Sequence, residues 1–457
     1  MSVKDDFEMQ VTERAAGEIT RLLMCNPEKN LARAAGVASL LASSDEQKRQ
    51  VEAVRRYLKD ASKQDPPPMG MQILRRAFDS VSPNCRSRLV MNLAMWMRHG
   101  TPRRDAAEEA GGCAPLVILM SPTMRCNLRC TGCYAAEYDR KDDLPAEVVE
   151  RVVNEAKDLG TYAITLLGGE PFIRDDVLDL FDRHPEMTFQ VFTNGTLVTD
   201  EVAHRLSEAG NVIVSFSIDG SALEHDMRRG QGTLQRTERG MAALRAAKVP
   251  FGSSTMVTSK NYLVVTSDEF VDYLVEQGCL WGWHFLYMPI GGSPDLSLMP
   301  TPAQREYLRV NGAARIRNEK PLFVMDFWND APYVGGCIAG REYIHVNSKG
   351  DVEPCIFAHF ATDNVKDKSL AEIMKSQFFS EIRSRQPYDE NLLRPCMLID
   401  NTHVAREVMS SCEAHPTHQG AEELLTSLAD GLDSYAAEYK QIADEAWIQR
   451  EKAKKTA

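Results

Sequence analysis

The chain has 457 residues, of which 43% are hydrophobic and 26% are charged, and its formal net charge is −12. These values are typical of a folded globular protein with two or three domains. They disfavour an extended nucleic-acid surface, which needs clustered cations, and no apolar stretch is long enough to cross a bilayer.

The first residues, MSVKDD, lack the hydrophobic core of a secretory signal, so a cytoplasmic location is expected. The chain contains eleven cysteines. Because the cytosol keeps thiols reduced, this number indicates metal ligation sooner than disulfides.

The first hundred or so residues predict helices only. Apolar positions recur at helical spacing in five stretches, at residues 11–24, 31–41, 51–58, 71–78 and 88–97. Pro66-Pro67-Pro68 breaks this region and Gly111-Gly112 ends it. The simplest interpretation is a packing domain that covers the rest of the protein. The alternative is docking of a substrate or partner through the Met-rich stretch at residues 91–97.

From Pro115 onward, strands alternate with helices. Six short apolar runs predict strands, at residues 116–120, 163–167, 188–192, 212–218, 252–257 and 283–287. Helical patterns lie between and after them, at residues 146–159, 175–183, 200–209, 234–247, 269–277 and 302–318. Six such units predict a parallel sheet curled into a partial barrel, with the chemistry at the carboxyl ends of the strands.

Three cysteines follow the first predicted strand: Cys126, Cys130 and Cys133. Three thiolates at this spacing can hold three corners of a cubic iron–sulfur cluster, and the fourth iron stays open to a small molecule. The same positions share one helix face, so three core cysteines are the alternative. The neighbouring breakers Ser121-Pro122 and Thr131-Gly132 favour a loop.

Past residue 323 the alternation stops. Residues 343–355 predict a hairpin that turns at Ser348-Lys349-Gly350. Cys337 and Cys355 stand on either side of it, and Cys396 and Cys412 follow. From about residue 420 the pattern is a charged amphipathic helix or helix pair. The four remaining cysteines lack partners at ligand spacing and are predicted to be ordinary buried residues: Cys25, Cys85, Cys113 and Cys279.

The Cys-x3-Cys-x2-Cys run resembles the cluster motif of the radical S-adenosylmethionine (radical SAM) enzymes. Further motifs match that family in order and place: Gly168-Gly169-Glu170-Pro171, Thr193-Asn194-Gly195, and Ser217 with Asp219. His225-Asp226 followed by Arg228-Arg229 is similar to the subset with a C-terminal auxiliary-cluster domain, called SPASM or, when shortened, twitch. The resemblance covers about residues 115–412.

This resemblance implies an α/β fold, a partial (β/α)6 TIM-like barrel with additions at both ends. We expect an N-terminal all-helical domain at residues 1–112 and the radical SAM core at residues 113–322. A cysteine-containing SPASM/twitch-like extension is expected at residues 323–418, and a C-terminal helix at residues 419–457.

The resemblance also implies the activity. A [4Fe–4S] cluster on Cys126, Cys130 and Cys133 would bind SAM, and an electron from a flavodoxin- or ferredoxin-type donor would cleave it. The resulting 5′-deoxyadenosyl radical would take a hydrogen atom from the substrate. The implied SAM contacts are Tyr134, Gly168, Gly169, Glu170, Pro171, Thr193, Asn194, Ser217, Asp219 and Arg229.

Each of these motifs also has a plainer interpretation. The glycine motif can be an ordinary strand-to-helix turn, and the short polar residues can be helix caps. Glu170 is expected to accept from the amino group of SAM. One position departs from the family, which usually has an aromatic residue just before the third cysteine; here Gly132 takes that place and Tyr134 comes after the cysteine.

Downstream, Gly350 and Cys355 fit the Gly-x4-Cys element of the same family. Cys337, Cys355, Cys396 and Cys412 are therefore expected to hold one auxiliary [4Fe–4S] cluster, with a structural zinc on the same four as the alternative.

The substrate is left open between a cofactor, a lipid or another small molecule, and a peptide. Relatives that modify peptides commonly begin with a winged domain that contains strands, and the helical start of this chain does not suggest one. Two rival functions are a non-catalytic iron–sulfur electron-transfer protein and a zinc-stapled interaction protein. Neither rival predicts an intact SAM pocket.

Overall fold

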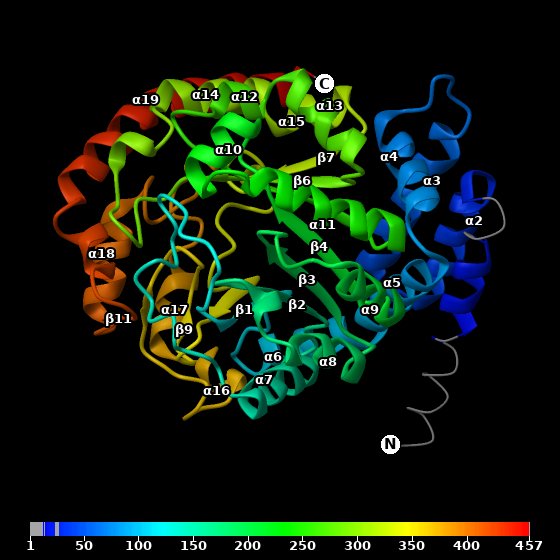
Figure 1. The fold of residues 1–457 in the computed structure, drawn as a ribbon, viewed down its shortest axis with the longest axis horizontal. Coiled ribbons are helices and arrows are strands. Elements are labelled where there is room, and N and C mark those ends of the chain that lie inside the picture. Colours follow the sequence, from blue (N-terminus) through cyan, green and yellow to red (C-terminus); the bar gives the residue numbers. More distant parts are fainter. Residues whose placement is uncertain (1–11, 13, 23–26, 457) are drawn as a thin grey trace.

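The fold is organised around one nine-stranded sheet (Figure 1). It is seen in a computed structural model that describes residues 12, 14–22 and 27–456. The strand order is β7-β6-β5-β4-β3-β2-β1-β8-β9, and every neighbouring pair except β8–β9 is parallel. The strands are β1 Val117–Thr123, β2 Ala163–Gly168, β3 Thr188–Thr193, β4 Val212–Ser217, β5 Phe251–Val257, β6 Trp281–Leu286, β7 Phe323–Asp326, β8 Tyr343–Val346 and β9 Val352–Glu353.

Helices cover the outer face of this curved sheet (Figure 1). Apolar residues at alternate strand positions, such as Ile118, Ile164 and Val214, are completely buried in the main core. Helix faces complete that core, as Val152 and Val153 of α7 do. The helices of this part are α7 Ala146–Asp158, α8 Asp176–Arg183, α9 Asp200–Ala209, α10 Ala222–Arg229, α11 Thr233–Ala247, α12 Tyr262–Val265, α13 Asp268–Gln277, α14 Pro302–Asn311 and α15 Ala313–Glu319.

The partial barrel that the sequence predicts is confirmed, and all six expected strands are present. Two further strands join the sheet in parallel, an arrangement that was not expected. β7 extends the sheet beside β6, and β8, the first strand of the predicted hairpin, pairs with β1 from residue 117 to residue 120. The hairpin itself is confirmed as β8–β9. The C-terminal part of the chain is therefore built into the barrel sheet.

The described residues before β1 form helices and connecting loops. Residues 14–22 are helical and precede α2 Pro27–Ala38, α3 Asp45–Ala61, α4 Met69–Ser80, α5 Pro83–Met95 and α6 Thr101–Glu109. α5 attaches this region to the barrel, where the Asn92 amide donates to the Met187 carbonyl over 2.8 Å. Met95 and Trp96 pack against the main core, which favours the packing interpretation of the Met-rich stretch.

The C-terminal part packs beside the barrel mouth. It contains β10 Phe360–Ala361, α16 Leu370–Ile373, α17 Gln377–Ser384, α18 Thr402–Ser411, β11 His415–Pro416 and α19 Ala429–Thr456. α19 runs along α14 at the rim of the barrel (Figure 1).

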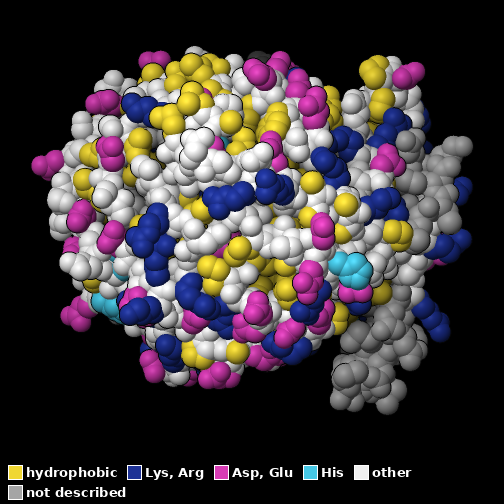
Figure 2. Space-filling model, viewed as in Figure 1, with side chains coloured by type: hydrophobic (Ala, Val, Ile, Leu, Met, Phe, Trp, Pro, Cys, Tyr) yellow, Lys and Arg dark blue, Asp and Glu magenta, His cyan; other side chains and the backbone are white. Residues whose placement is uncertain are grey.

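Side chains of both charges are interspersed over the face shown in Figure 2, as on most globular proteins. None of the described helices combines the length and apolar character that crossing a membrane requires.

Candidate active site

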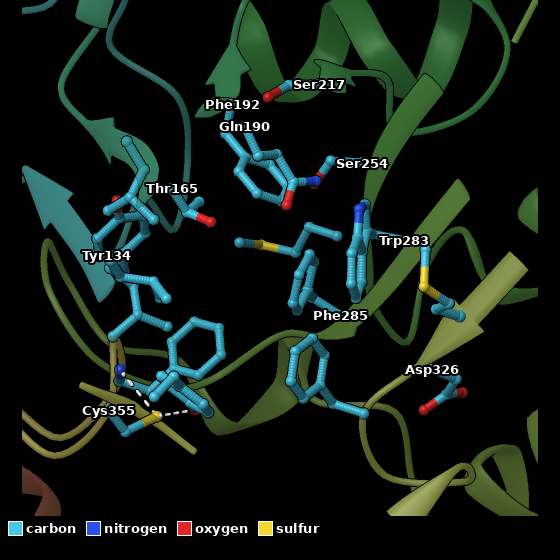
Figure 3. A pocket seen from close by; sticks show the side chains of 18 of the residues that line it. Tyr134, Thr165, Gln190, Phe192, Ser217, Ser254, Trp283, Phe285, Asp326 and Cys355 are labelled. Atoms are coloured by element: carbon cyan, nitrogen blue, oxygen red, sulfur yellow. Dashed lines mark hydrogen bonds between the residues drawn. The ribbon is translucent and has the colours of Figure 1, made fainter. Parts of the chain in front are cut away.

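A cavity of about 640 Å³ lies inside the curve of the sheet (Figure 3). The strand residues that line it alternate with those of the outer core, as in Gln190 and Phe192 of β3 or Trp283 and Phe285 of β6. This period of two follows from the pleat of a strand. Six cysteines reach the same cavity: Cys126, Cys130, Cys133, Cys337, Cys355 and Cys396.

The first three cysteines lie on a loop that begins after β1 and is held by backbone contacts. Gly169 N–H donates to the Thr123 carbonyl over 2.9 Å, and Glu170 N–H donates to the Arg125 carbonyl over 2.8 Å. A Cβ on Gly169 would lie 2.1 Å from that Arg125 oxygen, so only glycine permits the approach. The glycine motif is thus the support of the cysteine loop. The run is not helical, so the alternative of three cysteines on one helix face is wrong.

The three thiols on this loop suit a metal cluster better than an apolar core. Burial raises the pKa of Cys126 to about 11. Burial also raises the pKa of Cys133, and the neighbouring Cys130 adds to the effect. Such thiolates need nearby positive charge, which iron supplies on binding. The Leu128 N–H already points at the Cys126 sulfur from 3.5 Å. The three cysteines therefore fit the iron–sulfur cluster that the sequence predicts here.

Glu170 lies behind the cavity wall and connects two of the expected SAM motifs. Thr193 Oγ1 donates to its Oε1 over 2.6 Å, and Asn194 N–H donates to its Oε2 over 2.8 Å. Burial raises the pKa of Glu170 to about 7, against the opposing effect of these hydrogen bonds. Thr193 and Asn194 line the cavity, whereas Glu170 and Pro171 do not. A direct contact between Glu170 and SAM stays a prediction.

Asp219 also lies behind the wall and is neutralised by two arginines. Arg229 Nε and Arg228 Nη1 donate to its Oδ2 over 2.6 and 2.8 Å. Burial alone would raise the pKa of Asp219, but the two guanidinium groups outweigh it and hold the pKa well below its usual range. Both arginines and Ser217 line the cavity. Asp219 therefore orients cavity-lining cations and does not itself reach the space.

Tyr134, which the sequence places one residue after Cys133, forms hydrogen bonds with the backbone of the glycine motif. Its hydroxyl accepts from Gly168 N–H over 3.2 Å and donates to the Gly168 carbonyl over 3.3 Å. The ring lines the cavity and lies beside Phe357 and His359 of the C-terminal part.

Three of the four downstream cysteines converge on the cavity. The Tyr343 hydroxyl lies 3.0 Å from the Cys355 sulfur, and backbone N–H groups of Phe357 and Leu398 point at Cys355 and Cys396. Burial raises the pKa of Cys337 to about 12. Cys412 follows α18 and is not among the residues that line the cavity. The expected fourth ligand is therefore not among the cysteines that share the cavity.

Cys85, Cys113 and Cys279 are buried and stand apart from the cavity lining, as predicted for structural cysteines. Cys25 lies outside the described residues. Within the described part of the chain, no three Cys, His, Asp or Glu side chains are arranged to hold a metal ion. A cubic cluster makes a different demand on the protein, because each thiolate binds its own iron.

Two features of the site escaped the sequence interpretation. The first is a buried network around Glu353, which accepts from Tyr138 over 2.6 Å and lies 2.6 Å from His345 Nδ1; His345 Nε2 in turn lies 2.7 Å from the Ser121 hydroxyl. No spacing in the sequence points to this network.

The second is an aromatic side of the cavity. It consists of Phe192, Trp283, Phe285, Phe327, Trp328 and Phe357. The run Trp281-Gly282-Trp283-His284-Phe285, which overlaps the strand predicted at residues 283–287, is a signal that could have indicated it.

Comparison with known proteins agrees with this geometry. Residues 120–273 match the Radical SAM superfamily, and residues 337–397 match SPASM, an iron–sulfur cluster-binding domain. The chain therefore carries a radical SAM domain followed by a SPASM domain. It is a radical SAM enzyme with a C-terminal SPASM domain, so a SAM-binding [4Fe–4S] cluster, SAM and an auxiliary cluster are its cofactors.

Among its relatives, the AdoMet-dependent heme synthase of Oleidesulfovibrio alaskensis is 28% identical over 62% of this chain and 80% of that protein. The mycofactocin maturase MftC of Mycobacterium tuberculosis is 29% identical over 64% of this chain and 78% of that protein. The crystal structure of Streptococcus suis SuiB bound to S-adenosylmethionine shares the fold, with a TM-score of 0.55 and 20% identity over 76% of this chain and 84% of SuiB.

Proposed function

We propose that this radical SAM enzyme performs its chemistry inside this cavity, on a substrate held between the two cysteine groups. When bound, a cluster with one open iron supplies the one-electron cleavage of SAM to methionine and a 5′-deoxyadenosyl radical, which removes a hydrogen atom from the substrate. The observation that carries this proposal is that three cysteines of each group line one cavity together with residues of each SAM motif.

The chain's own residues position the reactants. Cys126, Cys130 and Cys133 would hold the cluster, and Gly168 with Gly169 lets backbone groups approach SAM closely. Glu170 fixes Thr193 and Asn194 at the cavity wall through its two hydrogen bonds. These groups hold SAM in one orientation, which lowers the entropic part of the activation barrier.

Two arginines supply positive charge at the same wall. Arg228 and Arg229 reach the cavity while paired with Asp219, so they can receive a carboxylate such as that of SAM. The apolar aromatic side keeps water away from the space where a reactive species would form.

Cys337, Cys355 and Cys396 would hold the auxiliary cluster. Cys412, the fourth ligand that the sequence predicts, does not line the cavity and is not needed in this proposal. A flavodoxin- or ferredoxin-type protein is the proposed electron donor, and the cytoplasm the proposed location. No nucleic-acid partner is proposed.

The relatives are named as a heme synthase and a mycofactocin maturase, so we propose modification of a cofactor, another small molecule or a peptide. The rival functions, electron transfer alone or a zinc-stapled interaction protein, would not require Gly168, Gly169 and Ser217 at one cavity wall.

The test is anaerobic reconstitution, followed by incubation with SAM and dithionite and chromatography for 5′-deoxyadenosine. Wild-type protein should form this product, and Cys130→Ala should not. Cys85→Ala is the matched control, because Cys85 is buried outside the cavity. A fully clustered wild-type protein that forms no 5′-deoxyadenosine would contradict the proposal.

A further inference from the structure

The part of the cavity away from the first three cysteines is shaped for a flat molecule. Trp283, Phe285 and Phe327 line it with ring planes within 15–24° of one another and centroids 5.4–6.0 Å apart. Near-parallel rings at this spacing accept another ring by offset stacking. Figure 3 shows Trp283 and Phe285 side by side along the space.

The charged side chains that line the cavity already form ion pairs or hydrogen bonds with other residues of the protein. Arg228 and Arg229 are bound to Asp219, and Asp330 forms a two-point ion pair with Arg317 at 2.6 and 2.7 Å. Asp326 accepts from Trp328 N–H, Asn329 N–H and the Asn329 amide. Arg228 and Arg229, which we assign to the carboxylate of SAM, are the cations among the described residues of this lining. The substrate is therefore neutral where it meets the rings.

Three uncharged polar side chains face the same space: Thr165 of β2, Gln190 of β3 and Ser254 of β5. Thr165 and Gln190 are direct partners in the sheet, and Ser254 is the partner of Trp283. Figure 3 shows Thr165 and Gln190 directed into the space before Trp283 and Phe285.

These side chains keep hydrogen-bonding capacity that the described protein does not use. Gln190 Nε2 donates to the Ser215 hydroxyl over 3.1 Å, and this is the hydrogen bond that its side chain makes there. Thr165 is 5% exposed, and neither its hydroxyl nor that of Ser254 has a hydrogen-bond partner among the described residues. These free donors and acceptors border the cavity, so they can pair with a ligand there.

We infer that this region binds the substrate through a neutral aromatic ring that carries a hydroxyl group. The ring stacks on the wall of Trp283, Phe285 and Phe327. The hydroxyl meets the Gln190 carboxamide and the hydroxyls of Thr165 and Ser254, because it both donates and accepts. This assignment rests on the proposed function, since it names the substrate class of the same cavity. A phenolic small molecule and a tyrosine side chain of a peptide share this chemistry.

The test measures binding to the cluster-loaded protein without reductant, by anaerobic equilibrium dialysis. The probes are 2-naphthol and 2-methylnaphthalene, which share shape but differ in the hydroxyl. Gln190→Leu should weaken 2-naphthol binding about 5- to 10-fold, the range for one lost hydrogen bond, and leave 2-methylnaphthalene unweakened. Phe285→Ala should weaken both probes. The matched control is Gln235→Leu, an exposed position on α11, which should change neither.

A second arm compares the peptides Gly-Tyr-Gly and Gly-Phe-Gly. If the wild-type protein prefers Gly-Tyr-Gly and Gln190→Leu loses this preference, the hydroxylated ring of the substrate is a tyrosine side chain of a peptide. If the protein prefers 2-naphthol to 2-methylnaphthalene but does not prefer the tyrosine peptide, the substrate is a small molecule. The assignment is overturned if Gln190→Leu affects both naphthalenes equally, or if no probe binds. Formation of 5′-deoxyadenosine by the wild-type protein is measured separately, without any probe. A failure of the proposed activity is thereby distinguished from a failure of the substrate assignment.

Discussion

Tyr138 donates a 2.6 Å hydrogen bond to Glu353, and this contact joins the loop of the first three cysteines to the strand that leads into Cys355. Both residues are buried, with exposed fractions of 2% and 0%. Thr417 and Asn347 donate to the same Glu353 oxygen over 2.6 and 3.0 Å. The two cluster-binding segments are therefore anchored on one buried carboxylate.

Tyr138→Phe should lower the free energy of unfolding by about 1–3 kcal/mol, because a buried carboxylate loses a charge-assisted donor. Urea unfolding of the metal-free protein measures it. The control is Tyr333→Phe, at a side chain that is 69% exposed, with an expected change under about 0.5 kcal/mol. Equal effects of the two substitutions would argue against the anchoring role.

Gly169→Ala should prevent the first cluster from assembling. The new Cβ would press on the Arg125 carbonyl and push the cysteine loop away from the sheet. Iron analysis after reconstitution should show loss of about four irons per chain. Gly17→Ala is the control, since a Cβ there meets no atom within 4 Å. Normal iron content in the Gly169 variant would refute the steric argument.

Cys396→Ser and Cys412→Ser should differ in auxiliary iron. Cys396 lines the cavity with Cys337 and Cys355, whereas Cys412 does not, so the first variant should lose about four irons and the second should keep them. Iron and sulfide analysis with visible absorption measures both. Loss of iron in Cys412→Ser would show that Cys412 is the fourth ligand of the auxiliary cluster.

Acid should destabilise the protein through His225. Burial, then the nearby Arg229, lowers the pKa of this histidine to about 4, and neither ring nitrogen has a hydrogen-bond partner in the described structure. Between pH 6.5 and pH 4 the unfolded chain binds the proton and the folded chain does not. Stability is therefore lost as pH falls through this window, by up to about 3 kcal/mol.

His225→Leu should remove this part of the acid sensitivity. Urea unfolding of wild type and variant at pH 6.5, 5 and 4 isolates it, because the other buried histidines are common to both proteins. An identical pH slope for the two proteins would show that His225 is not responsible.

Arg305→Leu should cost about 3–5 kcal/mol, because it leaves the carboxylate of Asp400 buried without its counter-charge. Arg305 Nη1 donates to Asp400 Oδ1 over 2.5 Å, and Asp400 Oδ2 accepts from Cys396 N–H over 3.1 Å. Thermal or urea unfolding measures the loss. The matched control is Arg205→Leu, whose exposed pairs with Asp179 and Asp182 should contribute less than about 1 kcal/mol.

Much of the barrel could be predicted because its six central strands are short apolar runs between helical patterns. β7 was missed because Phe323–Asp326 has four residues, begins with a half-exposed phenylalanine and ends in an aspartate. The pairing of β8 with β1 was missed because the apolar pattern of a strand does not identify a distant parallel partner.

The two cysteine groups and the motifs could be predicted from their spacing. Which of their residues line the cavity and which orient other residues could not. For Glu170 and Asp219, contact with SAM stays a prediction. What the sequence does not indicate is that these two residues orient Thr193, Asn194 and two arginines at the cavity wall. The polar side chains of the interior, such as Gln190, carry no motif. Only the pleat of β3 decides which way such a residue faces.

The pairing of β1 with β8 has a consequence for how the protein is made. β1 ends at residue 123, yet its neighbour on one side begins at residue 343. During synthesis that edge of β1 therefore stays open until most of the chain has left the ribosome, and an open strand edge invites association with other chains. A fragment that stops before residue 343 would carry this exposed edge permanently, so the SPASM region completes the barrel as well as following it.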